Sequence, residues 1–165
     1  MKLKIKIKLF GQQHLPELID KGDFVDLRYG GENTVYLNEG DYTLLGLGVA
    51  MKLPKGFEAI IVSRSSTYNR FGIMNPNGFG VIDGSYSGNN DEWKYPALAL
   101  RDSVVIHTGD RICQFRIQLS QKATAWQKLR WLFSSGIKFV KVDDLGGTDR
   151  GGFGSTGKNL VNIIW

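Results

Sequence analysis

The 165-residue sequence predicts an all-β fold, a distorted β-sandwich or jelly-roll-like barrel with one short inserted helix and a flexible glycine-rich C-terminal arm. Short runs rich in Val, Ile, Leu and Tyr alternate with many of the 21 glycines. Short strands at such spacing are typical of sandwiches and barrels. The length suits one hydrophobic core. We therefore expect a β body over residues 1–147 and an arm over residues 148–165.

The first ten residues alternate lysine with apolar side chains. A period of two predicts a strand with one wet and one buried face. The four lysines Lys2, Lys4, Lys6 and Lys8 account for most of the net charge of +5 and leave +1 when set aside. We interpret them as a solvated strand edge protected against pairing, and we expect no stable nucleic-acid binding. The segment also lacks the apolar centre of a signal peptide.

Seven further runs have the composition of β-strands and are bounded by glycine or other turn residues. They are Thr34–Leu37, Tyr42–Leu53, Phe57–Val62, Ala97–Leu100, Ser103–His107, Ile112–Leu119 and Phe139–Val142.

The segment from Ala123 to Ser135 departs from the β pattern. Four apolar residues recur there at helical spacing, and a glycine follows where a helix would stop: Trp126, Leu129, Leu132, Phe133 and Gly136. This pattern predicts an amphipathic helix. Either the helix packs on the body through this face, or it docks a partner.

Composition excludes several classes of protein. The single cysteine, Cys113, excludes an internal disulfide and a multi-cysteine zinc site, and the two histidines, His14 and His107, form no motif. No run approaches the roughly 18 apolar residues of a membrane-spanning helix. We therefore expect a cytoplasmic protein that does not bind membranes.

Arg64-Ser65-Ser66 combines a guanidinium with two hydroxyl donors. Such a set suits phosphate oxygens. A polar turn is the alternative interpretation of the same residues.

The run Asn77 to Tyr86 contains a second group of candidates. Val81 and Ile82 indicate a buried strand that ends at Asp83, where a rigidly held carboxylate can accept a proton from water. Asn77 has a carboxamide that can pair with a base edge, and Tyr86 has a flat apolar face. A β-hairpin with an Asp-Gly turn would also explain this run.

The segment Arg150 to Gly157 is half glycine. Its backbone N–H groups can face an anion, and Arg150, Ser155 and Thr156 add side-chain donors while Phe153 adds a stacking face. Further upstream, Gln114 follows the turn at Gly109 and is a candidate donor to a ligand.

Taken together and in order, these segments resemble the trimeric dUTP diphosphatase (dUTPase) family, of bacterial or phage type. The resemblance covers about residues 22–157. It rests on five segments that match the family motifs: Asp26-Leu27-Arg28, Arg64-Ser65-Ser66, Gly80–Tyr86, Gly109–Gln114 and Arg150–Gly157.

The resemblance implies hydrolysis of dUTP to dUMP and diphosphate, with Asp83 activating the water that attacks the α-phosphorus. It assigns the base edge to Asn77 and the backbone of Gly80 and Val81, and the deoxyribose to Tyr86. It assigns the phosphates to Arg64, Ser65, Ser66 and Gln114, and the closing arm to Arg150, Phe153, Gly154, Ser155 and Thr156. Mg²⁺ is the implied cofactor, held by Asp26 through a water molecule. The implied assembly is a homotrimer in which the arm of one subunit covers a pocket between two others.

Three features depart from the family pattern. Asp23-Phe24-Val25 replaces a small residue and glycine before Asp26, and Ser85 replaces an acid two positions after Asp83. The run Asn89–Tyr95 replaces a strand-like segment, so that Trp93 or Tyr95 is an alternative to Phe153 as cover for the base.

Two other functions compete with dUTP hydrolysis. A dCTP deaminase of the same fold has a similar Arg-Ser-Ser segment, but it typically has proline and glycine after its Ile-Asp, where this chain has Gly84-Ser85-Tyr86. A nucleotide-responsive protein that binds a regulatory protein partner is the second alternative, with the helical segment as its docking element.

Overall fold

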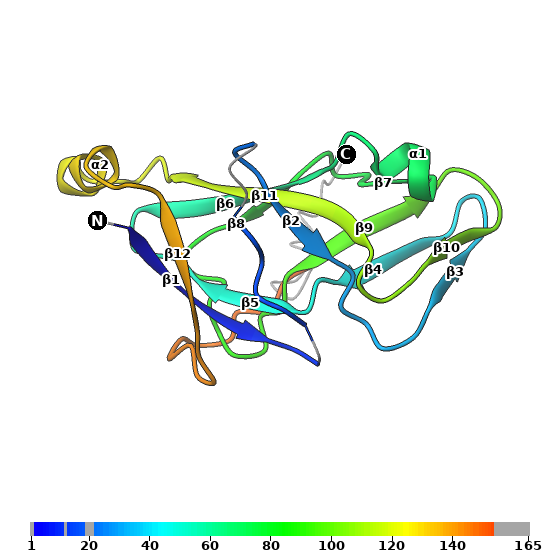
Figure 1. Ribbon diagram of the computed structural model, residues 1–165, viewed down its shortest axis with the longest axis horizontal. Coiled ribbons are helices and arrows are strands. Elements are labelled where there is room, and N and C mark those ends of the chain that lie inside the picture. Colours follow the sequence, from blue (N-terminus) through cyan, green and yellow to red (C-terminus); the bar gives the residue numbers. More distant parts are fainter. Residues whose placement is uncertain (1, 12, 19–21, 154–165) are drawn as a thin grey trace, which may run out of the picture.

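The computed structural model describes residues 2–11, 13–18 and 22–153 and is built mainly of short strands (Figure 1). The elements within these residues are β1 (Leu3–Leu9), β2 (Val25–Arg28), β3 (Val35–Leu37), β4 (Tyr42–Gly46), β5 (Val49–Lys52), β6 (Phe57–Ser63), α1 (Thr67–Phe71), β7 (Ile73–Met74), β8 (Gly80–Ile82), β9 (Lys94–Ala99), β10 (Val104–Ile106), β11 (Arg111–Leu119), α2 (Ala125–Leu132) and β12 (Ile137–Lys141).

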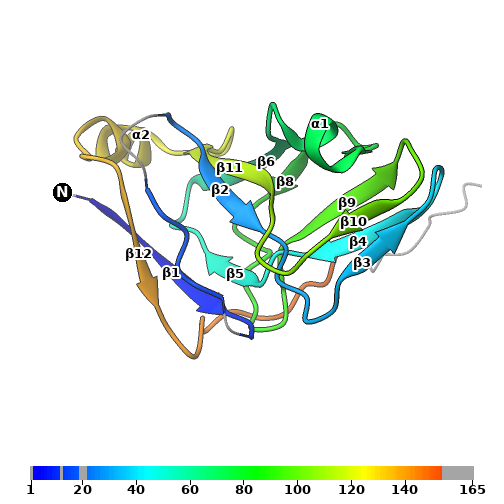
Figure 2. The ribbon, with the colours of Figure 1, turned by 45° about the vertical axis from the view of Figure 1, so that its right-hand side comes forward.

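The strands form four small sheets, in the orders β2-β11-β6-β8, β12-β1-β5, β4-β9-β7 and β10-β3. Figures 1 and 2 show the long strands β6 and β11 on one side and β1, β12 and β5 on the other. Strands β3, β4, β9 and β10 extend the body away from α2. This arrangement confirms the predicted all-β, distorted-sandwich fold.

Aromatic side chains join the two facing layers. The ring of Phe115 on β11 packs edge-on against Trp93, with ring centroids 5.2 Å apart, and lies 6.1 Å from the ring of Phe139 on β12. Trp93 and Tyr95 are both fully buried. Neither ring can therefore cover a ligand at the surface, and this excludes them from the base-covering role left open by the sequence.

The prediction that β1 forms a strand edge is wrong. Its lysines Lys4 and Lys6 are exposed, as expected, while Leu3, Ile5 and Ile7 are buried. The strand nevertheless lies in the middle of its sheet, parallel to β12 and antiparallel to β5. The partner β12 is more than 120 residues away in the chain, so period-two patterning could not reveal it.

All seven other predicted runs contain strands, and Tyr42–Leu53 divides into β4 and β5. The chain turns between them at Gly48, where φ is +66°. The backbone of Gly30 lies so close to this turn that a Cβ on Gly30 would be 2.5 Å from Gly48 N. The short helix α1 was not predicted, since its five residues contain no apolar period.

The predicted helix is present as α2, and the capping box of Thr124 and Gln127 explains where it starts. The apolar face singled out from the sequence does not pack on the body, however: Trp126, Leu132 and Phe133 are 81%, 72% and 76% exposed. The helix contacts the body through Trp131, whose ring lies 5.3 Å from that of Phe57.

Candidate active site

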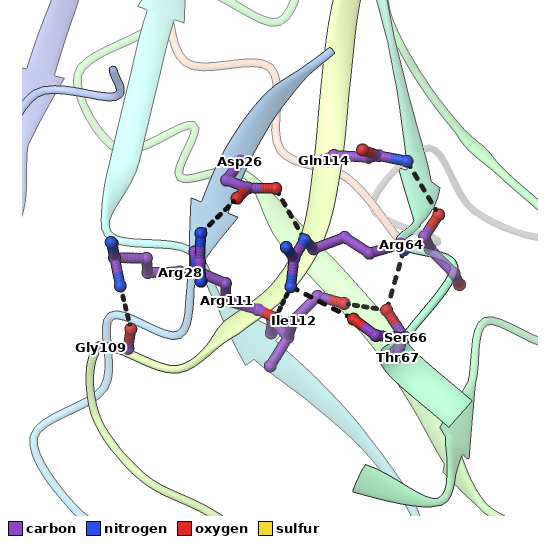
Figure 3. Close-up of polar contacts among 10 residues, drawn as sticks. Asp26, Arg28, Arg64, Ser66, Thr67, Gly109, Arg111, Ile112 and Gln114 are labelled. Carbon is purple, nitrogen blue, oxygen red and sulfur yellow. Dashed lines mark hydrogen bonds and ion pairs between the residues drawn. The ribbon is translucent and has the colours of Figure 1, made fainter. Parts of the chain in front are cut away.

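Asp26, Arg64, Arg111, Ser66 and Gln114 lie together where β2, β6 and β11 meet, and we call them the arginine cluster (Figure 3). Arg64 Nε lies 2.7 Å from Asp26 Oδ1, and Arg111 Nη1 lies 3.2 Å from Asp26 Oδ2. Two guanidinium groups thus share one carboxylate. The local excess of positive charge suits an anion with several oxygens, such as a polyphosphate.

The turn that carries Arg64 is held by the buried residue Thr67. The Thr67 hydroxyl accepts a hydrogen bond of 2.8 Å from Arg64 N and donates one of 2.9 Å to Ile112 O. Ser66 Oγ accepts a long bond of 3.4 Å from Arg64 Nη1, and Ser65 is exposed. The polar turn expected from the sequence is therefore present, and it carries the candidate phosphate-binding residues Arg64, Ser65 and Ser66.

Gln114 lies on β11, opposite Asp26 of β2 and Val62 of β6. Its Nε2 lies 3.4 Å from Ser63 O, which places the carboxamide beside Arg64 as Figure 3 shows. Asp26, Arg64, Ser66 and Gln114, which the sequence analysis named separately, are thus brought together. Arg111 was missed as a member of this group, since its partner Asp26 lies on another strand, far away in the sequence.

A second group of residues lines a cavity of about 340 Å³ over β8, which we call the β8 pocket. Predicted site residues on its wall are Asn77, Gly80, Val81, Tyr86, Arg150 and Phe153. Val81 is exposed, which corrects the prediction of a buried strand there. The alternative of a β-hairpin with an Asp-Gly turn also fails, because β8 pairs with β6 and residues 83–93, which are all described, form no strand.

Asn75 is a wall residue of the β8 pocket that sequence reasoning missed. It is almost completely buried, and its Oδ1 accepts a hydrogen bond of 2.9 Å from Asn77 N. Its Nδ2 has no protein partner among the described residues. A buried amide donor without a partner is costly, which marks this wall as suited to a ligand with an acceptor. The Asn-Pro-Asn sequence was the available signal.

Asp83 follows β8 and opens a turn closed by the bond from Tyr86 N to Asp83 O. The hydroxyl and the N–H of Ser85 both donate to Asp83 Oδ1. Arg150 Nη1 lies 3.2 Å from Asp83 Oδ2. The hydrogen bond from the Ser85 side chain has the largest effect on the pKa of Asp83 and lowers it. Burial, the next largest effect, raises this pKa, but the Ser85 backbone and Arg150 lower it further, so the pKa stays below its ordinary value. The carboxylate is therefore ionised near neutral pH and can accept a proton.

Tyr86 is half-buried beside this turn, and its hydroxyl donates to Glu92 O at 2.9 Å. Burial, together with the charges of Asp91 and Glu92, raises the pKa of Tyr86. The ring therefore stays neutral and presents a fixed apolar wall to the pocket. Gly152 approaches the ring so closely that a Cβ there would lie 3.4 Å from it.

The arginine cluster and Asp83 lie at opposite ends of β6. Ile82 pairs with Ala59 near the start of β6, whereas Arg64 follows Ser63 at its end. At about 3.3 Å per residue, this register separates Asp83 from Arg64 by roughly 15–20 Å. Within one chain, the predicted site residues thus fall into two groups that are too far apart to act on one triphosphate.

Three of the predicted site residues, Gly154, Ser155 and Thr156, lie outside the described residues, as does the tail Lys158–Trp165. Among the described residues, no group of three or more His, Cys, Asp or Glu side chains could hold a metal ion alone. No helix in this part of the chain is long and apolar enough to cross a membrane.

The arginine cluster offers the donors that a polyanion needs, and the small β8 pocket lies next to an ionised acid, Asp83, which follows its wall residue Ile82. Such features are typical of proteins that bind phosphorylated small molecules. The sequence model of the dUTPase family matches residues 26–125. The chain belongs to the dUTPase family, a family of hydrolases that act on triphosphate anhydride bonds. This confirms the resemblance seen in the motifs, and the family differs from the deaminase alternative.

Two curated relatives are similar over nearly the whole chain. A prophage-derived deoxyuridine 5′-triphosphate nucleotidohydrolase of Bacillus subtilis is 45% identical over 94% of this chain and 99% of its own. The deoxyuridine 5′-triphosphate nucleotidohydrolase of Finegoldia magna is 35% identical over the same shares of the two chains.

Solved structures support the fold. The dUTPase of Streptococcus mutans superposes with a TM-score of 0.63 at 22% identity, over 73% of this chain and 99% of its own. The dUTPase of Staphylococcus bacteriophage 80alpha gives a TM-score of 0.62 at 18% identity, over 73% and 92%. Another phage dUTPase, from phi11 of S. aureus, is described with a structural Mg(II) ion.

Proposed function

We propose that the chain hydrolyses dUTP to dUMP and diphosphate, with Asp83 as the general base for water attack on the α-phosphorus. One observation carries this proposal: Asp83 directly follows Ile82 and pairs with Arg150, both of which line the β8 pocket, and two Ser85 donors keep its carboxylate ionised. A general base must be deprotonated and within hydrogen-bond reach of its water. A carboxylate with a lowered pKa meets the first condition over a wide pH range.

The β8 pocket takes the nucleoside in this proposal. Asn77 and the backbone of Gly80 and Val81 read the uracil edge, and the donor of Asn75 adds a pairing group on the same wall. Tyr86 packs beneath the deoxyribose and leaves no room for a 2′-hydroxyl. Phe153, which also lines the pocket, covers the base in this proposal.

The arginine cluster takes the phosphates. Arg64, with Ser65, Ser66 and Gln114, neutralises charge that phosphoryl transfer concentrates on the equatorial oxygens. Arg150 reaches the triphosphate from the arm, together with Gly154, Ser155 and Thr156. The ion pair of Arg150 with Asp83 supports this role, because it puts the guanidinium next to the proposed general base.

Mg²⁺ fits this donor set as a substrate-bound ion, since Mg²⁺ sites commonly combine one or two carboxylates with substrate phosphates and several waters. Asp26 is the acid of the arginine cluster, and both its oxygens already accept from arginines. It would therefore hold the ion through a water molecule. When bound, Mg²⁺ neutralises phosphate charge.

A homotrimer completes the site. Because Asp83 and Arg64 lie roughly 15–20 Å apart in one chain, one dUTP meets the arginine cluster of one subunit and the β8 pocket of its neighbour. Cytoplasmic location of such an assembly stays a prediction.

Product analysis tests the proposed function. We expect diphosphate and dUMP from dUTP, little turnover of UTP, dTTP or the other dNTPs, and no ammonia from dCTP. Ammonia release from dCTP would identify a deaminase instead. Diphosphate release from UTP at the rate found with dUTP would contradict the assigned place of Tyr86.

Binding of a regulatory protein partner is a second candidate function, favoured by the exposed apolar side chains of α2. The test is capture of a host protein by the wild-type chain and by Trp126→Ser/Leu132→Ser, each with and without a non-hydrolysable dUTP analogue. Support requires a protein that binds the wild type, responds to the nucleotide and is lost with the α2 variant. Binding that ignores both changes excludes this role for α2.

A further inference from the structure

The lysines of β1 need an explanation other than the protection of a strand edge. Strand β1 is paired on both sides, with β12 and with β5 (Figure 2). It therefore has no free edge for charges to protect. Lys4, Lys6 and Lys8 nevertheless occupy every outward position of the strand. Edge protection was also the reason to expect no stable nucleic-acid binding, and the structure removes that reason.

The neighbouring strands place two more lysines on the same face of the sheet. Lys138 of β12 lies directly opposite Lys4, and Lys52 of β5 lies directly opposite Lys6. Lys4, Lys6 and Lys138 are exposed, whereas Lys8 and Lys52 are partly exposed. We call these five residues the lysine face. Their five charges equal the net charge of +5 of the whole chain, so the charges of all other residues balance.

This concentration of charge has a cost, because like charges directly opposite one another destabilise a sheet. Ion pairs do not offset it: in the part of the chain that the structure describes, every ion pair involves an arginine. One acid, Asp144, lies near the Lys8 end of the face. A hydrogen bond from the Asn89 side chain is the largest cause of its lowered pKa, and the charges of Lys8 and Lys6 add to this effect. The lysine face as a whole stays strongly positive.

The composition of the lysine face favours one class of anionic partner. Lysine presents a compact point charge on a flexible stem, whereas arginine is the residue that matches carboxylates with two parallel hydrogen bonds. Besides lysines, the outward positions of the three strands hold only Ala50 and Val140. Phe10, beyond the end of β1, already has the Lys8 ammonium 5.8 Å from its ring centroid. Single strands bind by stacking their bases on aromatic rings, so this face suits phosphates rather than bases.

The charges also repeat at regular intervals. Successive lysines on β1 are about 6.8 Å apart, and the three of them span about 14 Å along the strand. The directly opposed lysines of neighbouring strands begin about 5 Å apart. Double-stranded DNA carries one phosphate for every 1.7 Å or so of its axis. A face of this length can therefore contact several phosphates of one duplex at once.

We propose that the lysine face binds the phosphate backbone of double-stranded nucleic acid, weakly and without regard to sequence. Non-specific binding of this kind has a dissociation constant of about 10⁻⁴–10⁻⁶ M at physiological salt. The proposal does not depend on dUTP hydrolysis, because none of the five lysines belongs to the proposed active site.

The salt dependence of binding to a fluorescent DNA duplex of mixed sequence, measured by anisotropy, tests the inference. Each phosphate contact lowers the slope of log K against log salt by about 0.9, so five contacts give a slope of about −4.5. Lys4→Gln/Lys6→Gln should make the slope shallower by about 1.8 and weaken binding to all sequences alike. Absence of binding at low salt, or an unchanged slope in this variant, would overturn the inference.

The matched control removes the same charge elsewhere. Lys122→Gln/Lys128→Gln changes two exposed lysines, one before α2 and one within it, and should leave the slope unchanged. An equal loss in this control would mean that net charge alone, and not the lysine face, causes binding. Lys4→Arg/Lys6→Arg keeps the charge and should bind like the wild type. Weak binding by this arginine variant would contradict an electrostatic contact. Circular dichroism checks that each variant is folded.

Three further measurements separate the duplex from other partners and from the other basic site. Arg64→Ala should bind the duplex like the wild type, and loss of binding there would place the DNA on the arginine cluster instead. Polyglutamate that displaces the duplex as well as unlabelled DNA of equal charge would assign the face to an acidic protein. Tighter binding of the single strand than of the duplex would mean that bases contact the protein. Each of these three outcomes would overturn the inference.

Turnover of dUTP by the Lys4→Gln/Lys6→Gln variant should equal that of the wild type. Hydrolysis and duplex binding are therefore measured on the same proteins, and the failure of one proposal can be told from the failure of the other.

Discussion

Arg150 of the arm reaches Asp83, the proposed general base, across a distance of 3.2 Å between Nη1 and Oδ2. The two residues are 67 positions apart, yet they lie together because Asp83 directly follows β8 and the backbone N–H of Arg150 donates to the buried carboxylate of Asp91 at 3.0 Å. The ion pair couples the arm to the acid even without a substrate. We therefore expect the effects of a substitution at Asp83 and of a change in the arm on activity to be non-additive.

Asp83→Asn should keep dUTP binding and lower turnover by roughly 10²–10⁴-fold, the usual contribution of a general base. The amide has nearly the same shape but cannot take a proton from water. Steady-state rates, together with calorimetric binding of a non-hydrolysable dUTP analogue, check this expectation. Turnover near the wild-type value would remove Asp83 from its role.

Ser85→Ala should move the acid limb of the kcat/KM profile to higher pH. The Ser85 hydroxyl is the largest cause of the lowered pKa of Asp83, so its loss lets that pKa rise towards the ordinary aspartate value of about 3.9. The base is active when deprotonated, so a lowered pKa preserves activity as the pH falls, and a raised one loses it earlier.

The folding stability that Asp83 contributes should depend on pH in the same direction as the activity. A carboxyl whose pKa is lowered in the folded state contributes stability above its unfolded pKa, and loses it as the pH falls through the folded pKa.

Ser135→Ala, at an exposed serine beyond α2, is the control for the pH profile of kcat/KM. An unchanged acid limb in Ser85→Ala would contradict the assignment of Asp83 as the titrating base.

Tyr86→Ala should reduce the preference for dUTP over UTP. The wild-type ring is fixed by its bond to Glu92 O and by packing beside Gly152, so it cannot move aside for a 2′-hydroxyl. Removing it opens that space while leaving the base edge in place. The ratio of kcat/KM for the two nucleotides measures the effect, with Tyr86→Phe as the control that keeps the ring. A ratio unchanged by Tyr86→Ala would place the sugar elsewhere.

The local groups of the site were predictable because each is a short run whose chemistry depends on its own residues. The residues of Arg64-Ser65-Ser66 predict a polar turn by themselves. Val81 and Ile82 predict a strand, and Asp83 directly follows it. Contacts between distant segments were not predictable. In the sequence, Asp91 is a polar loop residue with no sign of its contact with the backbone N–H of Arg150. Arg111 on β11 likewise pairs with Asp26 on β2, which is far away in the sequence.

The burial of two aromatic residues, Trp93 and Tyr95, could not be predicted from the local sequence pattern either. Trp93 and Tyr95 stand in a polar run, where an exposed role is a reasonable interpretation, yet both lie in the core. Their burial depends on Phe115 of β11 and on Ser63 of β6, whose Oγ lies 2.6 Å from the Tyr95 hydroxyl. These partners come from other strands, and only the assembled sandwich brings them together.

Helix α2 contains two tryptophans, Trp126 and Trp131, and substitution of one is the control for substitution of the other. Trp131 packs against Phe57, whereas Trp126 is 81% exposed. Trp131→Ala should lower the free energy of unfolding by about 1–2 kcal/mol, since part of a large apolar side chain loses its burial. Trp126→Ala should change it by less than about 0.5 kcal/mol. Urea unfolding of both variants measures the difference. A larger loss for Trp126→Ala would mean that the outer face of α2 is covered in the assembled protein, most simply by a neighbouring subunit, and this would remove the observation that favours a regulatory partner there.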